Sequence, residues 1–444
     1  MFNKKTIRDV DLRGKVVLLR ADYNVPIEYS EGGEENILND FRIRSSLPTI
    51  NYLLENGVRK IIIISHLGRP NSVETLSDLS ELEKLPNGKR KFSLRPVFNR
   101  LRKILAEDSR CDLNEFKTDF PMNFHTTPIF ARTRYSVSMK DADDNYKIEM
   151  LENLRFSKDE KANSLEFAEA LIQVTGADLF VQDGFGVVHR SHTSTNAIVK
   201  KIPSVAGFLL EKEVSTILKA LKNPREPFVS IMGGAKISDK LPLIEKFINL
   251  SNKMIIGGAI ANTFLHWADF KIGKSKIEFG QDEVIEGIIE RAHQKFGKNF
   301  GADFILPTDV GVGTEFSSNS NRINKNLNEI NKNDYILDLG DYSISRLTRA
   351  VESAKTIIWN GTVGVSELEN FAKASEAVAV AISRATKNGA ISIVGGGDTS
   401  SFVLNWIEKN PEVAEFSLIS TGGGAALELM SGNSLPGLEI LPDR

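Results

Sequence analysis

The stretch ISIVGGGDTSSF at residues 391–402 decides how this chain folds. A short apolar run rich in β-branched residues is typical of a strand. Here the run stops at three consecutive glycines, followed by an aspartate and a row of hydroxyl side chains. Glycine loses more conformational freedom on folding than any other residue. Three in succession therefore indicate that another group approaches this backbone closely.

The same pattern, an apolar run that ends abruptly in a polar or glycine-rich turn, recurs along the chain. Continuous rather than alternating apolar strands are typical of a parallel sheet with helices on both faces. The other seven examples are KVVLLRADYN (15–24), KIIIISHLGR (60–69), ADLFVQDGFG (177–186), FVSIMGGAK (228–236), KMIIGGAI (253–260), TIIWNG (356–361) and FSLISTGGG (416–424).

Helical spacing of apolar residues appears between these strands, in SLPTINYLLENG (46–57), SLEFAEALIQVTG (164–176) and LIEKFINLSNK (243–253). We therefore predict an α/β fold of two doubly wound parallel-sheet domains. The domains are expected at residues 1–207, with the tail 433–444 packing back on them, and at residues 223–432. A helix at 208–222 would join them, because Val214, Ile217, Leu218 and Leu221 share one face and Asn223-Pro224 ends the run.

Composition limits the possible functions. The chain has 444 residues, 41% of them hydrophobic and 26% charged, which predicts two or three globular domains. The formal net charge of -2 provides no global field for nucleic acid or an anionic membrane, so neither is expected as a partner. Cys111 is the single cysteine, which excludes an internal disulfide and a cysteine-rich zinc site. No signal segment or long apolar run is apparent, and we expect a cytoplasmic protein.

The turns after the strands differ between the two halves. Open α/β sheets bind ligands outside the carboxyl ends of their strands. Guanidinium groups suit phosphate or carboxylate, and glycine turns ahead of helices let phosphates reach backbone N–H groups. We therefore expect a small anionic substrate in the first half and a nucleotide in the second. The first half offers Arg20, Asp22, Asn24, His66, Arg69, Asp183, His189, Arg190 and His192; the second offers Gly233, Gly234, Lys236, Gly257, Gly258, Gly395 to Gly397 and Gly422 to Gly424.

Simpler interpretations exist for several of these residues. His189 and His192 have the spacing of a metal pair, but no third ligand is evident. Asp398 is alternatively a cap for a helix starting at Thr399. Lys236 and Lys240 are alternatively the solvated face of a helix. Neither GxxxxGK[ST] nor a GxGxxG that opens a βαβ unit occurs, which disfavours a P-loop NTPase and a standard Rossmann dehydrogenase.

Eleven stretches taken together resemble the phosphoglycerate kinase family. They occur in the order of the family and span nearly the whole chain, so the set is specific although each stretch alone is weak. They are LRADYNVP (19–26), NDFRIRSSLPTI (39–50), SHLGRP (65–70), LENLRF (151–156), QDGFGVVHRSHTST (182–195), GGAKISDK (233–240), GGAIANTF (257–264), LPTD (306–309), WNGTVGVSE (359–367), GGGDTSSF (395–402) and STGGGAALELMSG (420–432).

The resemblance implies an enzyme of two domains joined by a hinge, with its ligands in the cleft between them. It would transfer a phosphoryl group reversibly between 1,3-bisphosphoglycerate and ADP, giving 3-phosphoglycerate and ATP. Magnesium would accompany the nucleotide, and a monomer is expected.

The resemblance also implies roles for individual residues. Phosphoglycerate would be held by Asp22, Tyr23, Asn24, Arg42, His66, Leu67, Gly68, Arg69, Arg155 and Arg190. The nucleotide would be held by Gly234, Lys240, Gly257, Gly258, Asn360, Glu367, Gly396, Gly397, Asp398 and Thr399, with Asp398 reaching the magnesium ion and Glu367 the ribose. Arg42, Lys236 and Lys240 would be the catalytic residues.

The chain departs from the family pattern in places. Thr362 stands where proline usually follows WNG, and Ser366 stands where phenylalanine is usual, so the preference between adenine and guanine stays open. The polar segment 71–147 is longer than expected, and we interpret it as an enlarged surface excursion. Residues 318–334 are expected to be rich in loops.

Two other classes of function remain possible. A non-catalytic relative would be expected to lose charged site residues first, yet Lys236, Arg42 and Asp398 are all present. A kinase for another carboxylate is the stronger alternative, and substrate competition would distinguish it.

Overall fold

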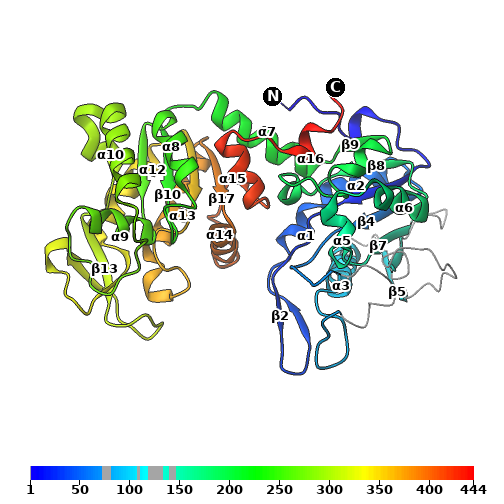
Figure 1. Ribbon diagram of the computed structural model, residues 1–444, viewed down its shortest axis with the longest axis horizontal. Coiled ribbons are helices and arrows are strands. Elements are labelled where there is room, and N and C mark those ends of the chain that lie inside the picture. Colours follow the sequence, from blue (N-terminus) through cyan, green and yellow to red (C-terminus); the bar gives the residue numbers. More distant parts are fainter. Residues whose placement is uncertain (1, 73–81, 108–110, 119–133, 140–146) are drawn as a thin grey trace. The chain divides into compact units, whose positions relative to one another are not determined.

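The computed structural model describes residues 2–72, 82–107, 111–118, 134–139 and 147–444. The chain divides into two compact units, which we call unit 1 and unit 2. Unit 1 comprises residues 1–215 and 434–444, and unit 2 comprises residues 216–433. Figure 1 labels the elements of each unit.

Unit 1 is built on a seven-stranded sheet. Neighbouring strands from β7 through β4, β1 and β8 to β9 are parallel, whereas β5 and β6 are antiparallel additions at one edge. Arg20 pairs with Ile64 on one side and with Gln182 on the other, so three strands end at the same level. In spatial order the strands are β5 (Cys111–Thr118), β6 (Arg134–Met139), β7 (Lys147–Leu151), β4 (Lys60–Ile64), β1 (Val16–Arg20), β8 (Leu179–Gln182) and β9 (Ser204–Ala206).

Both faces of this sheet are buried. Val17 and Leu19 on β1 belong to a core cluster with residues of α2 and α3. Val16 and Leu18, which alternate with them, belong to a second cluster with residues of α6. Unit 1 is therefore doubly wound. Its remaining elements include α1 (Phe41–Ser45), α2 (Leu47–Glu55), α3 (Arg95–Glu107), α5 (Lys158–Ala162), α6 (Leu165–Thr175), α16 (Pro436–Glu439), and the hairpin of β2 (Ile27–Tyr29) and β3 (Glu35–Ile37).

One interpretation of the segment 71–147 was wrong. Residues 95–107 form α3, and its side chains Val97, Phe98 and Leu101 are fully buried in the core of unit 1. The polar composition of the surrounding sequence concealed this amphipathic helix. Residues 73–81, 108–110, 119–133 and 140–146 of the segment lie outside the described residues.

Unit 2 contains a six-stranded sheet in which every neighbouring pair is parallel. Met232 pairs with Ile256 and with Asn360, and Asn360 pairs with Gly395, so four strands end at one level. In spatial order the strands are β12 (Phe304–Ile305), β11 (Lys253–Ile256), β10 (Phe228–Met232), β16 (Thr356–Asn360), β17 (Ile391–Gly395) and β18 (Leu418–Ile419).

Helices again cover both faces of this sheet. Val229 and Ile231 share a core cluster with residues of α12, α13 and α14. The alternating residue Phe228 packs its ring on Phe247 of α8, with ring centroids 5.8 Å apart. The helices of unit 2 are α8 (Leu241–Leu250), α9 (Gly258–Trp267), α10 (Asp282–Phe296), α11 (Phe300–Asp303), α12 (Asp341–Glu352), α13 (Lys373–Lys387), α14 (Gly397–Lys409) and α15 (Gly424–Ser431).

A small antiparallel sheet accompanies the large one in unit 2. Its strands are β14 (Ile323–Asn326), β13 (Asp309–Gly313) and β15 (Tyr335–Leu339), in that order. The segment 318–334 thus contains one short strand and a 3-10 helix at Leu327–Glu329. All eight predicted strands are present in the two units, and the predicted α/β class with two doubly wound sheets is confirmed.

Helix α7 (Phe208–Lys222) contains the division between the units. It ends directly before Asn223, where the sequence predicted. The end of the chain belongs to unit 1, because it is hydrogen-bonded to the start of the chain. The Arg444 N–H donates to the Asn3 carbonyl at 2.8 Å, and the Lys5 N–H donates to the Pro442 carbonyl at 2.9 Å. Figure 1 shows both termini beside β9 and α16 of this unit.

Gly257 lies in the turn after β11, where Val363 leaves no room for a side chain. A Cβ atom there would lie 2.7 Å from Cβ of Val363, whereas one at Gly287 in α10 would meet nothing within 4 Å. We expect Gly257→Ala to lower the free energy of unfolding by about 1–3 kcal/mol through overpacking. Gly287→Ala should raise it by about 0.5–1 kcal/mol, because alanine loses less entropy in a helix. Urea denaturation of both variants checks this, and an unchanged midpoint for Gly257→Ala would contradict it.

Candidate active site

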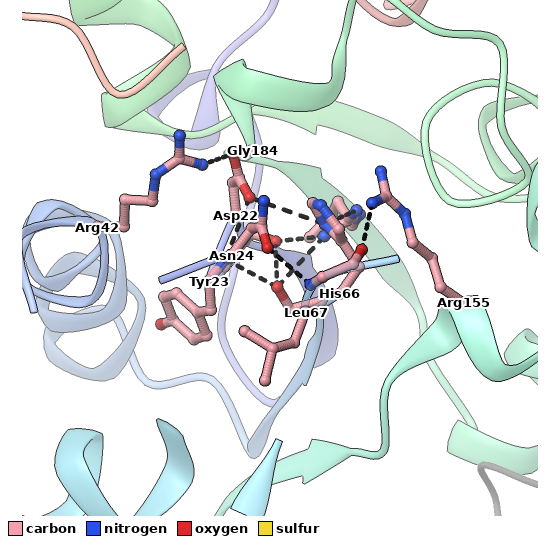
Figure 2. A network of polar contacts seen from close by, with 12 residues as sticks. Asp22, Tyr23, Asn24, Arg42, His66, Leu67, Arg155 and Gly184 are labelled. Atoms are coloured by element: carbon pink, nitrogen blue, oxygen red, sulfur yellow. Dashed lines mark hydrogen bonds and ion pairs between the residues drawn. The ribbon is translucent and has the colours of Figure 1, made fainter. Parts of the chain in front are cut away.

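The first candidate site lies at the level ends of β1 and β4 in unit 1 (Figure 2). The Asn24 side chain accepts a hydrogen bond from the Gly68 backbone N–H at 2.7 Å and so joins the turns that follow these two strands. Gly68 has a φ of +61°, and a Cβ atom there would lie 2.4 Å from the Phe92 ring. Only glycine fits this turn without strain.

Asp22 holds the side chain of Arg42, which comes from α1. The two form a direct hydrogen-bonded ion pair. Burial opposes ionisation of Asp22, but the charge of Arg42 and its neighbours outweighs burial and lowers the Asp22 pKa to about 2. Asp22 is therefore a carboxylate at neutral pH, and it fixes Arg42 at the edge of the site.

His66 is a neutral, buried member of the same network. Burial, together with the charges of nearby arginines, lowers its pKa well below the ordinary value. The Arg20 guanidinium lies 3.2 Å from Nδ1 of His66. Because a guanidinium only donates, Nδ1 must be the acceptor, and the remaining proton belongs on Nε2. Asp22 lies 3.7 Å from the same nitrogen.

Arg155, in the 3-10 helix Leu154–Phe156, is a second cation besides Arg42 at this site. Its guanidinium donates to the Gly68 carbonyl at 2.7 Å. Burial and the charges of Arg20 and Arg190 lower its pKa to about 10, so it remains cationic at neutral pH. Figure 2 shows Arg42 and Arg155 on opposite sides of Asp22 and His66. Closely grouped cations of this kind suit a small anion.

The other predicted residues of unit 1 have different surroundings. The Tyr23 hydroxyl lies in the core, 2.7 Å from Ser46 Oγ, and burial raises its pKa, so it stays un-ionised. Leu67 presents its carbonyl to Asn153 at 2.8 Å. Arg69 and Arg190 are exposed, and Arg190 donates to His189 Nε2 at 3.0 Å.

Sequence reasoning missed the buried groups that support this network. Ser194 accepts from Arg20 at 2.8 Å and donates to Glu160 at 2.6 Å. Ser65 accepts from the Tyr23 backbone N–H at 2.9 Å. Ser65 directly precedes His66 and Ser194 lies in the HRSHTST stretch, so proximity to a motif was the available signal.

Asp183 follows β8 but supports a helix instead of facing the arginines. Its carboxyl accepts from the backbone N–H groups of Leu209 and Leu210, at 2.9 and 3.2 Å, in the first turn of α7. Burial raises the Asp183 pKa to about 7, although these hydrogen bonds oppose the effect. The turn after β8 therefore joins the sheet edge to the start of α7.

The second candidate site lies at the level strand ends of unit 2, where glycines let three turns touch. The Gly234 N–H donates to the Thr362 carbonyl at 3.0 Å, and Gly258 donates to Val363 at 2.9 Å. A Cβ atom at Gly258 would lie 2.8 Å from the Gly234 nitrogen. The close packing of these turns therefore by itself requires glycine at position 258.

Asn360 and Thr399 connect the glycine turns to the predicted charged residues. The Lys240 ammonium donates to the Asn360 side chain. Thr399 accepts from the Gly361 backbone N–H at 2.7 Å. Helix α14 begins at Gly397 with Gly396 as its N-cap and no side-chain cap, so the interpretation of Asp398 as a cap is wrong. Asp398 lies exposed in the first turn of that helix.

The two predicted lysines precede a helix and do not form a solvated helical face. Lys236 lies exposed in the loop between β10 and α8, and Lys240 is the N-cap of α8. Burial lowers the Lys240 pKa, while Asp239 and Asp398 oppose that shift.

A cavity of about 480 Å³ opens beside these turns within unit 2, between the large sheet and the small one. Such a volume accommodates a nucleoside-sized ligand. Four predicted residues line it, namely Gly234, Gly258, Glu367 and Asp398, and so does Thr362. Pro307, Phe316, Asn262 and Leu337 also line the cavity. The sequence did not single out any of them, although Pro307 belongs to the LPTD stretch and Asn262 to the GGAIANTF stretch.

Comparisons with known proteins show the family of this chain. The sequence matches the family described as Phosphoglycerate kinase over residues 7–433. The chain belongs to the phosphoglycerate kinase family. It is 40% identical to the phosphoglycerate kinase of Chloroflexus aggregans over 442 residues, covering 100% of both chains. It is 35% identical to that of Thermosipho africanus over 444 residues, covering 100% of this chain and 99% of the relative.

Solved phosphoglycerate kinases have the same fold. The structure from Coxiella burnetii matches with a TM-score of 0.75 and 32% identity, covering 99% of this chain and 98% of that one. The structure from Pyrococcus horikoshii OT3 matches with a TM-score of 0.73 and 27% identity, covering 98% of both. The predicted family and the predicted class of enzyme, a phosphotransferase, are confirmed.

Two findings bear on metals and membranes. Within the described ranges, no group of three or more His, Cys, Asp or Glu side chains is arranged to hold a metal ion. Nor does that part of the chain contain a helix with the length and apolarity needed to cross a membrane.

The raised pKa of Asp183 makes a prediction about stability and pH. Between its ordinary pKa of 3.8 and about 7, the folded protein holds a proton at Asp183 that the unfolded chain releases. Folding stability therefore falls as pH rises through this window, by at most about 1.4 kcal/mol per pH unit, and levels off above it. Asp183→Asn has no proton to lose at this position, so its stability should not fall in this way. The unfolding free energy of each protein is measured with urea from pH 4.5 to 8, and the variant should gain stability relative to the wild type as pH rises. Parallel profiles would disprove the raised pKa of Asp183.

Proposed function

We propose that the protein transfers a phosphoryl group reversibly between 1,3-bisphosphoglycerate and ADP, yielding 3-phosphoglycerate and ATP in glycolysis and gluconeogenesis. The observation that supports this most is the cluster of Arg42, Arg155 and His66 around Asp22, in a chain of the phosphoglycerate kinase family. Arg20, Arg42 and Arg155 face two carboxylates, Asp22 and Glu160, and an anionic ligand would balance the remaining positive charge.

The phosphoglycerate would bind in unit 1. Arg155, Arg69 and Arg190 supply guanidinium groups for its phosphate and carboxylate, and neutral His66 donates from Nε2. Asn24 and Gly68 hold the turns in place. Leu67 acts through its backbone, and Tyr23 acts through packing beneath Asp22.

The nucleotide would bind in unit 2, in the 480 Å³ cavity and at its glycine turns. Glu367 lines this cavity and would bind the ribose. The backbone at Gly396 and Gly397, where α14 begins, would bind phosphate. Gly234, Gly257, Gly258, Asn360 and Thr399 shape the same edge, with Lys240 held by Asn360.

Magnesium would accompany the nucleotide. Mg²⁺ in nucleotide sites takes one or two protein carboxylates, with phosphate oxygens and water filling its other positions. Asp398 is exposed in the first turn of α14, beside the Gly396 turn, and fits this requirement. When bound, the ion would neutralise charge on the phosphates.

The chemistry needs charge stabilisation more than proton transfer. In the direction that consumes ATP, the nucleophile is a carboxylate that is already ionised at neutral pH, so no general base is required. Positive charge must surround the oxygens of the phosphoryl group in flight, and Lys236 and Arg42 are proposed to supply it. Lys240 would assist on the nucleotide side.

Direct transfer requires the ligand of unit 1 and the ligand of unit 2 to meet. We therefore propose a cleft between the units that closes by hinge bending at α7, which would also exclude water from the acyl phosphate. We also propose, from the family resemblance, that the protein is monomeric and cytoplasmic. Size-exclusion chromatography with light scattering would test the oligomeric state.

The purified protein should form ADP from ATP and 3-phosphoglycerate in a manner that requires magnesium. Oxidation of a reduced nicotinamide by an enzyme that consumes the acyl phosphate provides the readout. GTP run in parallel reports the preference that Thr362 and Ser366 leave open. Turnover with a different carboxylic acid but not with 3-phosphoglycerate would replace the proposal with a kinase for that acid, and nucleotide binding without any turnover would indicate a non-catalytic relative.

Replacing Lys236 by alanine should reduce kcat by a factor of hundreds or more without unfolding the protein. The lysine is exposed in the structure, and its charge is needed mainly in the transition state. Steady-state kinetics and thermal denaturation give the two readouts. Lys298→Ala removes an equal charge from an exposed position of the same unit and should keep wild-type turnover. A folded Lys236→Ala enzyme with normal kcat would rule out the proposed role.

A further inference from the structure

The loop between β10 and α8 is held by the fully buried side chain of Ile237 and by contacts with other parts of unit 2. It carries Lys236 and ends at Lys240, and its residues 235, 236, 238 and 239 are exposed. Within the loop, the Lys240 N–H donates to the Ile237 carbonyl at 2.9 Å. A turn of this kind leaves Lys236 on a backbone that is bonded to the sheet mainly at Gly233 and Gly234. A misplacement of about 1 Å can cost a reaction two orders of magnitude in rate.

Glu278 supplies a contact from a distant part of unit 2. Its carboxylate accepts one hydrogen bond from the Ser238 backbone N–H at 3.1 Å and another from the Ser238 hydroxyl. Glu278 precedes α10 and lies 40 residues away in the sequence. These two hydrogen bonds hold both the backbone and the side chain of Ser238.

The backbone of Glu278 is also hydrogen-bonded to α9, the helix that begins at Gly258. The Glu278 backbone N–H donates to the Thr263 hydroxyl at 3.2 Å. Thr263 in turn donates to the Ala259 carbonyl at 3.0 Å, in the first turn of α9 after Gly258. Glu278 therefore spans from the lysine loop to the helix whose start lines the nucleotide cavity.

The electrostatics of Glu278 suit this position. Slight burial opposes ionisation, but the hydrogen bonds from Ser238 and Ile237 and the charge of Lys236 together lower the Glu278 pKa. The side chain is thus a carboxylate at neutral pH, and Lys236 is near enough to contribute to that shift.

We propose that Glu278 is a positioning residue for phosphoryl transfer, which holds Ser238 and thereby orients the loop that carries Lys236 relative to the start of α9. The inference rests on the proposed catalytic role of Lys236. Glu278 acts through the loop and touches no reacting atom.

Kinetics of Glu278→Ala and Glu278→Gln test this role. The alanine variant should lose about tenfold to a hundredfold in kcat, with KM for both substrates changed by less than about threefold. Glutamine keeps an acceptor oxygen for the Ser238 N–H, so it should recover part of the loss. Glu286→Ala, an exposed substitution on α10, should behave as the wild type in both parameters.

A double-mutant cycle with Lys236→Ala determines whether Glu278 acts through Lys236. If it does, the double variant has the residual kcat of Lys236→Ala alone. Multiplicative losses, or a kcat for Glu278→Ala that merely follows a lower melting temperature, would overturn the inference. Wild-type kcat in Glu278→Ala beside an impaired Lys236→Ala would overturn it too while leaving the proposed function intact. Wild-type kcat in Lys236→Ala would instead remove the catalytic role on which the inference rests.

Discussion

The register of the parallel strands is the constraint on which both candidate sites depend. In unit 1, Arg20 stands opposite Ile64 and Gln182, and in unit 2, Asn360 stands opposite Met232 and Gly395. Because parallel strands point the same way, each sheet delivers the turns after its strands to a single edge. Residues far apart in sequence thereby become neighbours. A shift of one residue in any pair would turn its side chains to the opposite face and dissolve the cluster.

The two units use that edge in opposite ways. In unit 1 side chains occupy the edge of the sheet, where Arg20 and Arg155 face the carboxyl groups of Asp22 and Glu160. Unit 2 places glycines there instead, so that the turns at Gly234 and Gly258 pack closely beside the cavity with their own N–H groups bonded to Thr362 and Val363. The uncapped start of α14 at Gly397 belongs to the same edge. A compact substrate with two anionic ends is recognised by guanidinium groups, whereas a nucleotide needs an apolar slot and backbone donors.

Sequence reasoning predicted the strands correctly because each has a local signal, and the charged residues that it proposed for the sites lie mostly in the turns after those strands. A run such as KIIII predicts a buried strand, and the turn after it must be polar. Reasoning overlooked the helical spacing of Val97, Phe98 and Leu101 in α3, because the sequence around this helix is polar. It also failed where the signal is not local. Leu337 lines the cavity from β15 and Phe316 from the loop between β13 and β14, and no single stretch encodes the pairing of this small antiparallel sheet.

Carboxyl groups with raised pKa values often indicate active sites, but Asp183 and Asp338 hold the starts of helices. Burial raises the pKa of both Asp183 and Asp338 to about 7. Asp183 accepts from the first turn of α7, and Asp338 accepts from the Ala374 N–H at 3.3 Å, at the start of α13. A reaction whose nucleophile is already ionised needs no base poised near neutral pH. The proposed chemistry needs cationic groups at fixed positions instead, and the ion pair of Arg42 with Asp22 and the hydrogen bond of Arg155 to the Gly68 carbonyl provide such placement.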